Sequence, residues 1–218
     1  MGIKEIYEIL PITYKAAMDI VVKNHYLHRK GPCSNAYGLF EIKTGRIAGV
    51  ITYGKPASDH LCRGICGNDE SPNVVELTRL WVEDATPKNV ESFLIANTIK
   101  MLDKEIIVSY ADSSQNHLGI VYQATNWIYT GLSDRHVKWR IEGMGNVHSR
   151  HWQDQYGGLN NAKKILGDLM IREERPRKHR YIYFNCNKWR KRELVDKLRY
   201  KPQPYPKEGI FCCLKLEA

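Results

Sequence analysis

Short stretches of apolar residues recur along the chain, and their spacing predicts β-strands. The first stretch alternates imperfectly, and the next two are apolar runs joined by a four-residue turn that contains Gly45, as in a β-hairpin. Near-continuous apolar runs farther along are typical of strands covered on both faces. The predicted strands are residues 3–12, 36–42, 47–53, 74–82, 106–110, 129–141, 181–184 and 210–216.

Apolar residues spaced three or four apart predict amphipathic helices between these strands. The second helix is expected to start at Thr86-Pro87, because threonine can cap a helix and proline suits its first position. The predicted helices are residues 14–22, 86–101, 120–128, 161–170 and 188–199. Inward-facing positions expected in the second and the last helix are Val90, Phe93, Leu94, Met101, Trp189, Leu194, Val195 and Leu198. Residues 55–73 and 143–158 are polar, lack periodicity and are predicted to be loops.

The order of these elements predicts an α/β fold in which a mixed central sheet carries helices on both faces. A chain of 218 residues fits one domain, here residues 1–218. Ligands of such sheets bind at the carboxyl ends of the strands. Two strand ends carry polar residues, one just after Val82 and the other at Asp112, and we expect an active site between them.

The positive charge of the chain is concentrated near its C-terminus. Residues 172–201 hold twelve Lys and Arg against four Asp and Glu, which accounts for +8 of the net charge of +9. Aromatic residues are interleaved with these cations, a combination that binds phosphates and stacks on bases. We therefore expect this basic C-terminal extension to contact double-stranded DNA, although a solvated basic face is the alternative. The candidate phosphate contacts are Arg175, Arg177, Lys178, Arg180, Lys188, Arg190, Lys191 and Arg192.

The cysteine content indicates a reducing compartment. Six cysteines are few for this length, no signal-peptide pattern opens the chain, and no apolar run approaches the ~20 residues of a membrane span. A cytoplasmic protein without membrane contact is expected, as a monomer or a homodimer. His60, Cys62 and Cys66 resemble zinc ligands, but the second pair that a zinc site needs has only His148 and His151 as candidates.

Two places in the sequence carry candidate chemistry. Strand alternation puts Tyr110 and Asp112 on one face, which suits acid–base work or metal binding. The alternative is that Asp112 caps the following turn. His25 continues the apolar face of the first helix at its end, next to Tyr26, and either belongs to a site or favours the helix dipole.

Three segments of the chain together resemble the Mom family of phage DNA-modification proteins. The segments are VELTRLWV at residues 75–82, SYADSS at 109–114 and VYQATNWIYTG at 121–131. His25-Tyr26, which precedes the predicted hairpin, fits the same family. The resemblance extends from about residue 24 to 131, and the later residues are similar only in being basic.

This resemblance implies a fold like that of the GNAT N-acyltransferases and an enzyme that adds a carbamoylmethyl (glycinamide-like) group to N6 of adenine in phage DNA. Such a modification hides DNA from host restriction enzymes. The resemblance also implies a functional set that holds iron, with further residues near a cofactor or donor. The functional set is His25, Tyr26, Asp112 and Tyr122, and the cofactor residues are Arg79 and Ser92. The chain departs from ordinary GNAT enzymes because no glycine lies between Val82 and Phe93, so acetyl-CoA is not the expected donor.

The implied chemistry has consequences for the pocket and leaves two other functions to consider. Because N6 of adenine is paired in a duplex, the base must flip into a pocket, where Tyr26, Tyr110, Tyr122 or Trp127 would stack on it. An N-acyltransferase for a small-molecule or protein amine would instead bind coenzyme A and turn over without DNA. A non-catalytic DNA-binding protein on the same fold would tolerate substitutions in the site.

Overall fold

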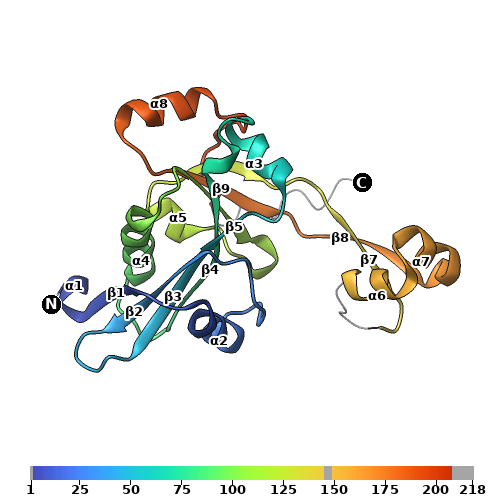
Figure 1. Ribbon diagram of the computed structural model, residues 1–218, viewed down its shortest axis with the longest axis horizontal. Helices are drawn as coiled ribbons and strands as arrows, with labels where there is room; N and C mark the ends of the chain where they lie inside the picture. Colours follow the sequence, from blue (N-terminus) through green and yellow to red (C-terminus); the bar gives the residue numbers. More distant parts are fainter. Residues whose placement is uncertain (1, 145–148, 208–218) are drawn as a thin grey trace.

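The computed structural model describes residues 2–144 and 149–207. Its centre is a seven-stranded sheet with the strand order β1-β2-β3-β4-β5-β9-β6 (Figure 1). Within that sheet only β4 and β5 pair in parallel, so the expected mixed sheet is confirmed. The strands are β1 (Tyr7–Pro11), β2 (Asn35–Glu41), β3 (Ile47–Gly54), β4 (Val74–Val82), β5 (Ile106–Asp112), β6 (Ile128–Leu132) and β9 (Lys178–Phe184).

Helices cover both faces of this sheet, as the sequence predicts. One face packs against α1 (Ile3–Ile6), α4 (Val90–Thr98) and α5 (Ile120–Ala124) and forms the largest buried cluster. The opposite face packs against α2 (Tyr14–Asn24), α3 (Asp59–Cys66) and α8 (Lys188–Asp196). Short 3-10 turns occupy Ser71–Asn73, Ile99–Met101, Ser113–Gln115 and Gly167–Leu169.

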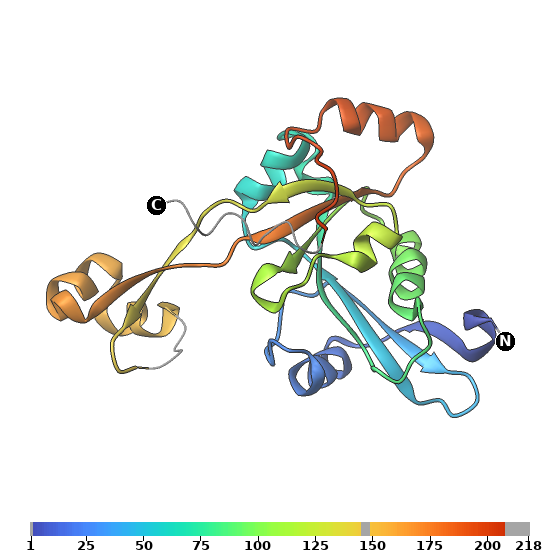
Figure 2. The same ribbon diagram turned by 180° about the vertical axis from the view of Figure 1, so that it is seen from behind.

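A two-stranded arm projects from the side of the sheet (Figures 1 and 2). Its strands are β7 (Val137–Ile141) and β8 (Met170–Glu174), which pair in antiparallel fashion, and it carries α6 (Ser149–Tyr156) and α7 (Leu159–Leu166). The arm has a small core of its own, formed by Ile141, Trp152, Ala162 and Met170. It is inserted between β6 and β9, so its base lies beside the start of β9.

Several expected strand boundaries are wrong. Residues 3–6 of the strand expected at 3–12 form a helical turn before β1, where the Glu5 carboxylate accepts a hydrogen bond of 3.0 Å from the Gly2 amide. Residues 129–141 form two strands in different sheets: β6 has an irregular register around Gly131, at a φ of 82°, and the chain then leaves the central sheet. The strand expected at 210–216 lies outside the described residues, as do Cys212 and Cys213.

The loop expected at 55–73 is wrong because it contains α3. Ser58 caps this helix by accepting a hydrogen bond from the Leu61 amide, and Gly67 ends it with a φ of 105°. Cys62 and Cys66 lie one turn apart on its buried face and point into the core. The described cysteines are free thiols, and no group of three or more His, Cys, Asp or Glu side chains among the described residues is arranged to bind a metal.

Other helix predictions need correction at their ends and faces. The loop expected at 143–158 contains α6, and the second helix starts at Val90 instead of Thr86, after Asn89 in a left-handed conformation. Met101, expected to be buried, is exposed beyond the end of α4, and Val195 is also exposed. Trp189 is 78% exposed, so Leu194 anchors α8. None of the described helices is long and apolar enough to cross a membrane.

Candidate functional site

The site begins where β4 and β5 separate. Their parallel pairing runs from Val74 opposite Ile106 to Glu76 opposite Val108 and ends there. Beyond this point the strands enclose a pocket of about 550 Å³, which we call the β4–β5 pocket. It lies between the two strand ends that the sequence singles out, and a volume of this size suits a small organic ligand.

A β-bulge at Thr78 determines which β4 side chains enter the pocket. Thr52 pairs with Arg79 while Tyr53 pairs with Leu77, so Thr78 is the extra residue. Its hydroxyl donates a hydrogen bond of 2.9 Å to the Pro32 carbonyl. Core contacts on the α4 side come from Val75, Leu77, Leu80 and Val82. The bulge therefore places Glu76 and Arg79 on the opposite face, where both line the pocket.

His25 lies at the end of α2 with its ring held against the pocket. The Leu27 amide donates a hydrogen bond of 3.1 Å to its Nδ1, and the side chain is buried. Burial, aided by the positive charge of Arg79, lowers the pKa of His25 to about 4. The imidazole is therefore neutral at pH 7, and a cationic His25 that stabilises the helix dipole is not supported.

Tyr26 and Asp112 form a hydrogen-bonded pair at the pocket. The Tyr26 ring stacks on His25 with centroids 4.5 Å apart, and its hydroxyl donates to the Asp112 carboxylate. Asp112 also accepts from the Ser114 amide at 3.0 Å and lies 3.4 Å from Lys178 Nζ. Burial alone would raise the pKa of Asp112, but these partners outweigh it and hold the pKa below its ordinary value. Asp112 therefore caps the following turn and also faces Tyr26.

Tyr122 lies on the other side of the sheet from this group. It belongs to the core that α4 covers, and its hydroxyl is 2.8 Å from the Ser109 hydroxyl. Burial raises the pKa of Tyr122 to about 12, so the phenol is neutral. The structure thus brings His25, Tyr26 and Tyr122 to one pocket, with Asp112 hydrogen-bonded to Tyr26 beside it, but the hydroxyl of Tyr122 is directed to Ser109.

The residue types of this group fit the iron that the resemblance implies. His25 is a neutral imidazole, Asp112 an ionised carboxylate and Tyr26 a phenol, and nitrogen and oxygen donors of these kinds suit iron. Tyr122 does not fit the same ligand set, because its hydroxyl is directed to Ser109. A metal on Nδ1 of His25 would replace the hydrogen bond from Leu27.

Glu76 is a pocket residue that the sequence analysis missed. Among the described residues, none donates a hydrogen bond to its carboxylate or forms an ion pair with it, although Lys178 and Arg79 are near enough to influence it. Burial raises the pKa of Glu76 to about 7, against an ordinary value of 4.5. The available signal was an acidic residue inside a largely apolar strand, which an edge position would also explain.

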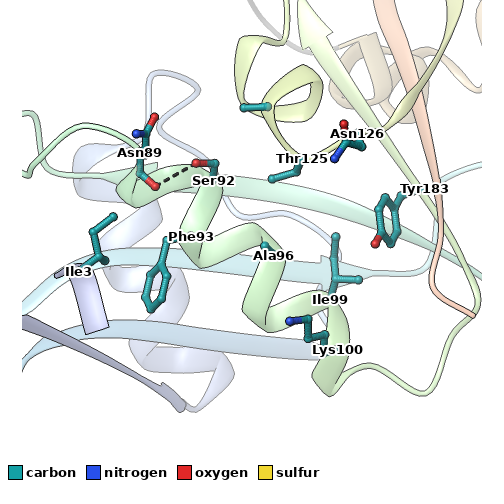
Figure 3. Close-up of a pocket in the computed structure, with 11 residues that line it drawn as sticks. Ile3, Asn89, Ser92, Phe93, Ala96, Ile99, Lys100, Thr125, Asn126 and Tyr183 are labelled. Carbon is teal, nitrogen blue, oxygen red and sulfur yellow. Dashed lines mark hydrogen bonds between the residues drawn. The ribbon is translucent and has the colours of Figure 1, made fainter. Parts of the chain in front are cut away.

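The two expected cofactor residues lie in different places. Arg79 lines the β4–β5 pocket, and its buried Nε has no hydrogen-bond partner among the described residues. Ser92 lines a separate pocket between α4 and α5, where its hydroxyl donates to the Asn89 carbonyl at 2.9 Å (Figure 3). The structure therefore does not bring Ser92 together with Arg79.

The basic segment does not form one continuous surface. At one end of β9, Lys178 lies opposite Asp112, the last residue of β5. At the other end, Phe184 lies opposite Ile106, the first residue of β5, and α8 follows it. The seven residues of β9 span roughly 20 Å at the rise of a strand. The candidate phosphate contacts therefore form a group at the base of the arm and a second group on α8.

Four of the eight candidate phosphate contacts have hydrogen-bond or ion-pair partners inside the protein, and Lys178 with its ion pair to Asp112 is one of them. Arg180 is buried, stacks on the Tyr200 ring and donates from Nε to the Thr130 hydroxyl at 3.0 Å. Arg190 forms ion pairs with three carboxylates, the closest at 2.5 Å to the buried Glu70. Arg177 donates to the Ser133 carbonyl at 2.5 Å, and the exposed members are Arg175, Lys188, Lys191 and Arg192.

Comparison with known proteins gives both a family and a set of similar folds. Two solved acetyltransferases show a similar fold. One is a putative acetyltransferase from Salmonella typhimurium, solved with acetyl-CoA, and it is 12% identical to this chain. The match covers 83% of this chain and 95% of that chain, with a TM-score of 0.46. The other, an N-acetyltransferase from Staphylococcus aureus Mu50, is 11% identical, with coverages of 83% and 99% and a TM-score of 0.47. In sequence, the chain is 29% identical to Methylcarbamoylase mom of Escherichia phage Mu, over 94% of this chain and 86% of that protein. The family model of the Mom protein family matches residues 6–207, and the chain belongs to this family.

Proposed function

We propose that this protein adds a carbamoylmethyl group to N6 of adenine in double-stranded DNA and thereby protects phage DNA from host restriction in the bacterial cytoplasm. Membership of the Mom family, with a relative named as a methylcarbamoylase, is the observation that carries this proposal. The β4–β5 pocket supports it, because its volume of about 550 Å³ accommodates a flipped base together with a small donor.

Aromatic side chains at the pocket can receive the base. Tyr26 is 40% exposed and lines the pocket together with Tyr110, so a base can stack on either ring. Trp127 is fully buried between Tyr122 and Tyr183 and does not line the pocket, which excludes it as a stacking platform. Tyr122 lines the pocket from the α4 side, where its neutral hydroxyl can only shape the inner wall.

The charged residues at the pocket have separate tasks in this proposal. Carbamoylmethyl transfer forms a bond between N6 and the CH2 group of the donor and breaks the bond from that CH2 to its leaving group. Iron held by His25, Tyr26 and Asp112 would supply a Lewis acid for the departing group. Tyr26 would bind the iron as a phenolate and must lose its proton to do so, since burial and the neighbouring Asp112 charge raise its pKa when no metal is bound. Arg79 faces the same pocket as a cation with an unpaired Nε, and it can bind a polar group of the donor.

DNA phosphates would meet the protein at the base of the arm. Arg175, Arg177 and Lys178 lie there, directly beside the carboxyl end of β5, and the exposed Arg135 belongs to the same place. A duplex that delivers a base into the β4–β5 pocket passes this group of cations. We expect it to contribute more to affinity than the basic residues of α8 at the far end of β9.

Nucleoside mass spectrometry of plasmid DNA tests the proposal. The plasmid is recovered from bacteria that express the soluble protein, digested to nucleosides and compared with plasmid from cells that express Asp112→Ala. A modified deoxyadenosine with the mass of a carbamoylmethyl adduct is expected only with the wild-type protein. Unmodified adenine in both samples would refute the proposal, and DNA-independent turnover of coenzyme A thioesters would favour an N-acyltransferase for other amines.

A further inference from the structure

The Glu76 carboxylate is placed in the β4–β5 pocket without a structural reason. Asp112 receives hydrogen bonds from Ser114 and Tyr26 and the charge of Lys178. Glu91, another acidic residue at the pocket, lies in the first turn of α4, where the helix dipole favours a negative charge. Glu76 has no such partner among the described residues. Because partial burial of a carboxylate without a donor is unfavourable, a ligand that donates a hydrogen bond to Glu76 would stabilise it.

Glu76 lies where β4 and β5 begin to separate. It occupies the last β4 position that pairs with β5, opposite Val108, and the two strands separate beyond it. Arg79 and Trp81 follow on the same strand beyond the point of separation, and Tyr26 and Lys178 also line the pocket, with Lys178 close enough to act on the Glu76 charge. A flat base that enters the gap between the separated strands, with its sugar outside, would present its far edge to Glu76.

That far edge differs between bases in a way that a carboxylate can read. Adenine carries an exocyclic amino group there, which donates hydrogen bonds, whereas guanine and thymine carry a carbonyl oxygen. An ionised carboxylate only accepts hydrogen bonds, so it attracts the amino group and repels the carbonyl oxygen. On the proposed function, we infer that Glu76 binds the exocyclic amino group of the target adenine and discriminates against bases that carry a carbonyl oxygen at that position.

A binding experiment with analogues of the target base separates this role from a structural one. Short duplexes are built around a site found modified in the plasmid, with the target nucleotide opposite an abasic position so that it is already unpaired. The target is adenine, purine or hypoxanthine, which carry at C6 an amino group, a hydrogen atom or a carbonyl oxygen. Binding of each duplex is measured at about pH 8, where Glu76 is ionised, with the wild-type protein, with Glu76→Gln and with Glu8→Gln. Glu8 is exposed on β1, so its substitution is a matched control for the lost negative charge.

We expect the wild-type protein to bind the adenine duplex about tenfold or more tightly than the hypoxanthine duplex, with purine between them. Loss of a hydrogen bond to a charged group changes affinity by about that factor. Glu8→Gln keeps this preference. Glu76→Gln loses most of it, because the glutamine amide donates to a carbonyl as readily as it accepts from an amino group. Glu76→Asp, which keeps the charge but shortens the side chain, should retain the order of preference with weaker binding of adenine.

Two results would overturn the inference. One is a folded Glu76→Gln variant with the wild-type preference, and the other is a wild-type protein that binds the three duplexes equally. Both leave the proposed function intact if modified deoxyadenosine is found in the plasmid. Absence of that nucleoside would instead count against the proposed function itself, so the two failures are distinguishable.

Discussion

Replacing Glu76 by glutamine should stabilise the folded protein at about pH 8 and leave its stability unchanged at about pH 4. The reason is the partly buried carboxylate, which has lost part of its hydration and has no paired donor among the described residues. Glutamine has almost the same shape, carries no charge and keeps the pocket filled. The substitution therefore removes the electrostatic penalty with little change in packing.

The size of the effect follows from the pKa of Glu76, which is raised from 4.5 to about 7. Each pKa unit corresponds to ~1.4 kcal/mol, so full expression of this difference would destabilise the fold by ~3 kcal/mol. The pocket is open to water, which screens part of the penalty. We expect the free energy of unfolding of Glu76→Gln to exceed that of the wild type by about 1–3 kcal/mol at pH 8.

The sign of the pH dependence is fixed by the same pKa. Below pH 4.5 the carboxyl group is protonated in the folded and unfolded chains, and Glu76 carries no penalty. Between 4.5 and about 7 the unfolded chain loses the proton first, so the wild type loses stability relative to the variant. Above about 7 the difference stays constant. The pKa of His25, lowered to about 4, has the opposite effect, because it makes the folded protein more stable as the pH rises above about 4. The wild type and the variant share this contribution, so it cancels in the difference between them.

Urea unfolding followed by circular dichroism, at several pH values for both proteins, measures the difference directly. Glu8→Gln again controls for the change in net charge, and it should follow the wild type within about 0.5 kcal/mol. The reasoning fails if Glu76→Gln is less stable than the wild type at pH 8, or if the difference between the two proteins does not vary with pH. A stabilised variant that has lost adenine discrimination is the combination expected of a functional residue.

Three further outcomes follow from the placement of the other charged residues. Asp112→Asn should lower the iron content of the purified protein, whereas Tyr122→Phe should retain it, as measured by plasma mass spectrometry. Equal loss of iron in both variants would contradict the exclusion of Tyr122 from the set of iron donors. Arg190→Ala should lower the free energy of unfolding by about 2–4 kcal/mol, because it leaves the buried Glu70 poorly paired, while Lys188→Ala changes it by less than ~0.5 kcal/mol in the same urea titration. Alanine at two residues of the arm base should flatten the slope of log K against log salt by about 1.8, and the same change on α8 should flatten it less; equal slopes would refute the proposed path of the duplex. The two pairs are Arg135 with Arg175 and Lys191 with Arg192.

The sequence predicts the central sheet well because long apolar strands leave a strong pattern. The hairpin of β2 and β3, the parallel strands β4 and β5 and the helix that follows β5 are all recognisable from spacing. The helix α3 is not, because its eight residues provide only two turns of periodicity. The arm was predicted only in part. The helix expected at 161–170 overlaps α7 and the strand expected at 129–141 contains β7, but α6 and the five-residue strand β8 were missed.

The local sequence of α8 shows how a charge pattern can mislead. Arg190 belongs to a run of cations that looks suited to phosphates, yet its guanidinium pairs with Glu70, Glu105 and Glu193. Two of these carboxylates come from segments more than 80 positions away in the chain. A run of Lys and Arg gives the net charge of a segment, but tertiary contacts determine which cations are available to a ligand.

The site was only partly predictable for a reason that Glu76 and Arg79 illustrate. Strict alternation along β4 places these two residues on opposite faces, since they are three positions apart. The bulge at Thr78 adds one residue to the strand and brings both side chains to the pocket. That bulge depends on β3, where Thr52 and Tyr53 set the register, and on the Pro32 carbonyl that accepts from Thr78. The sequence around β4 shows that Glu76 and Arg79 are present. It does not show that both side chains reach one pocket, because the partners that set the bulge are distant in sequence.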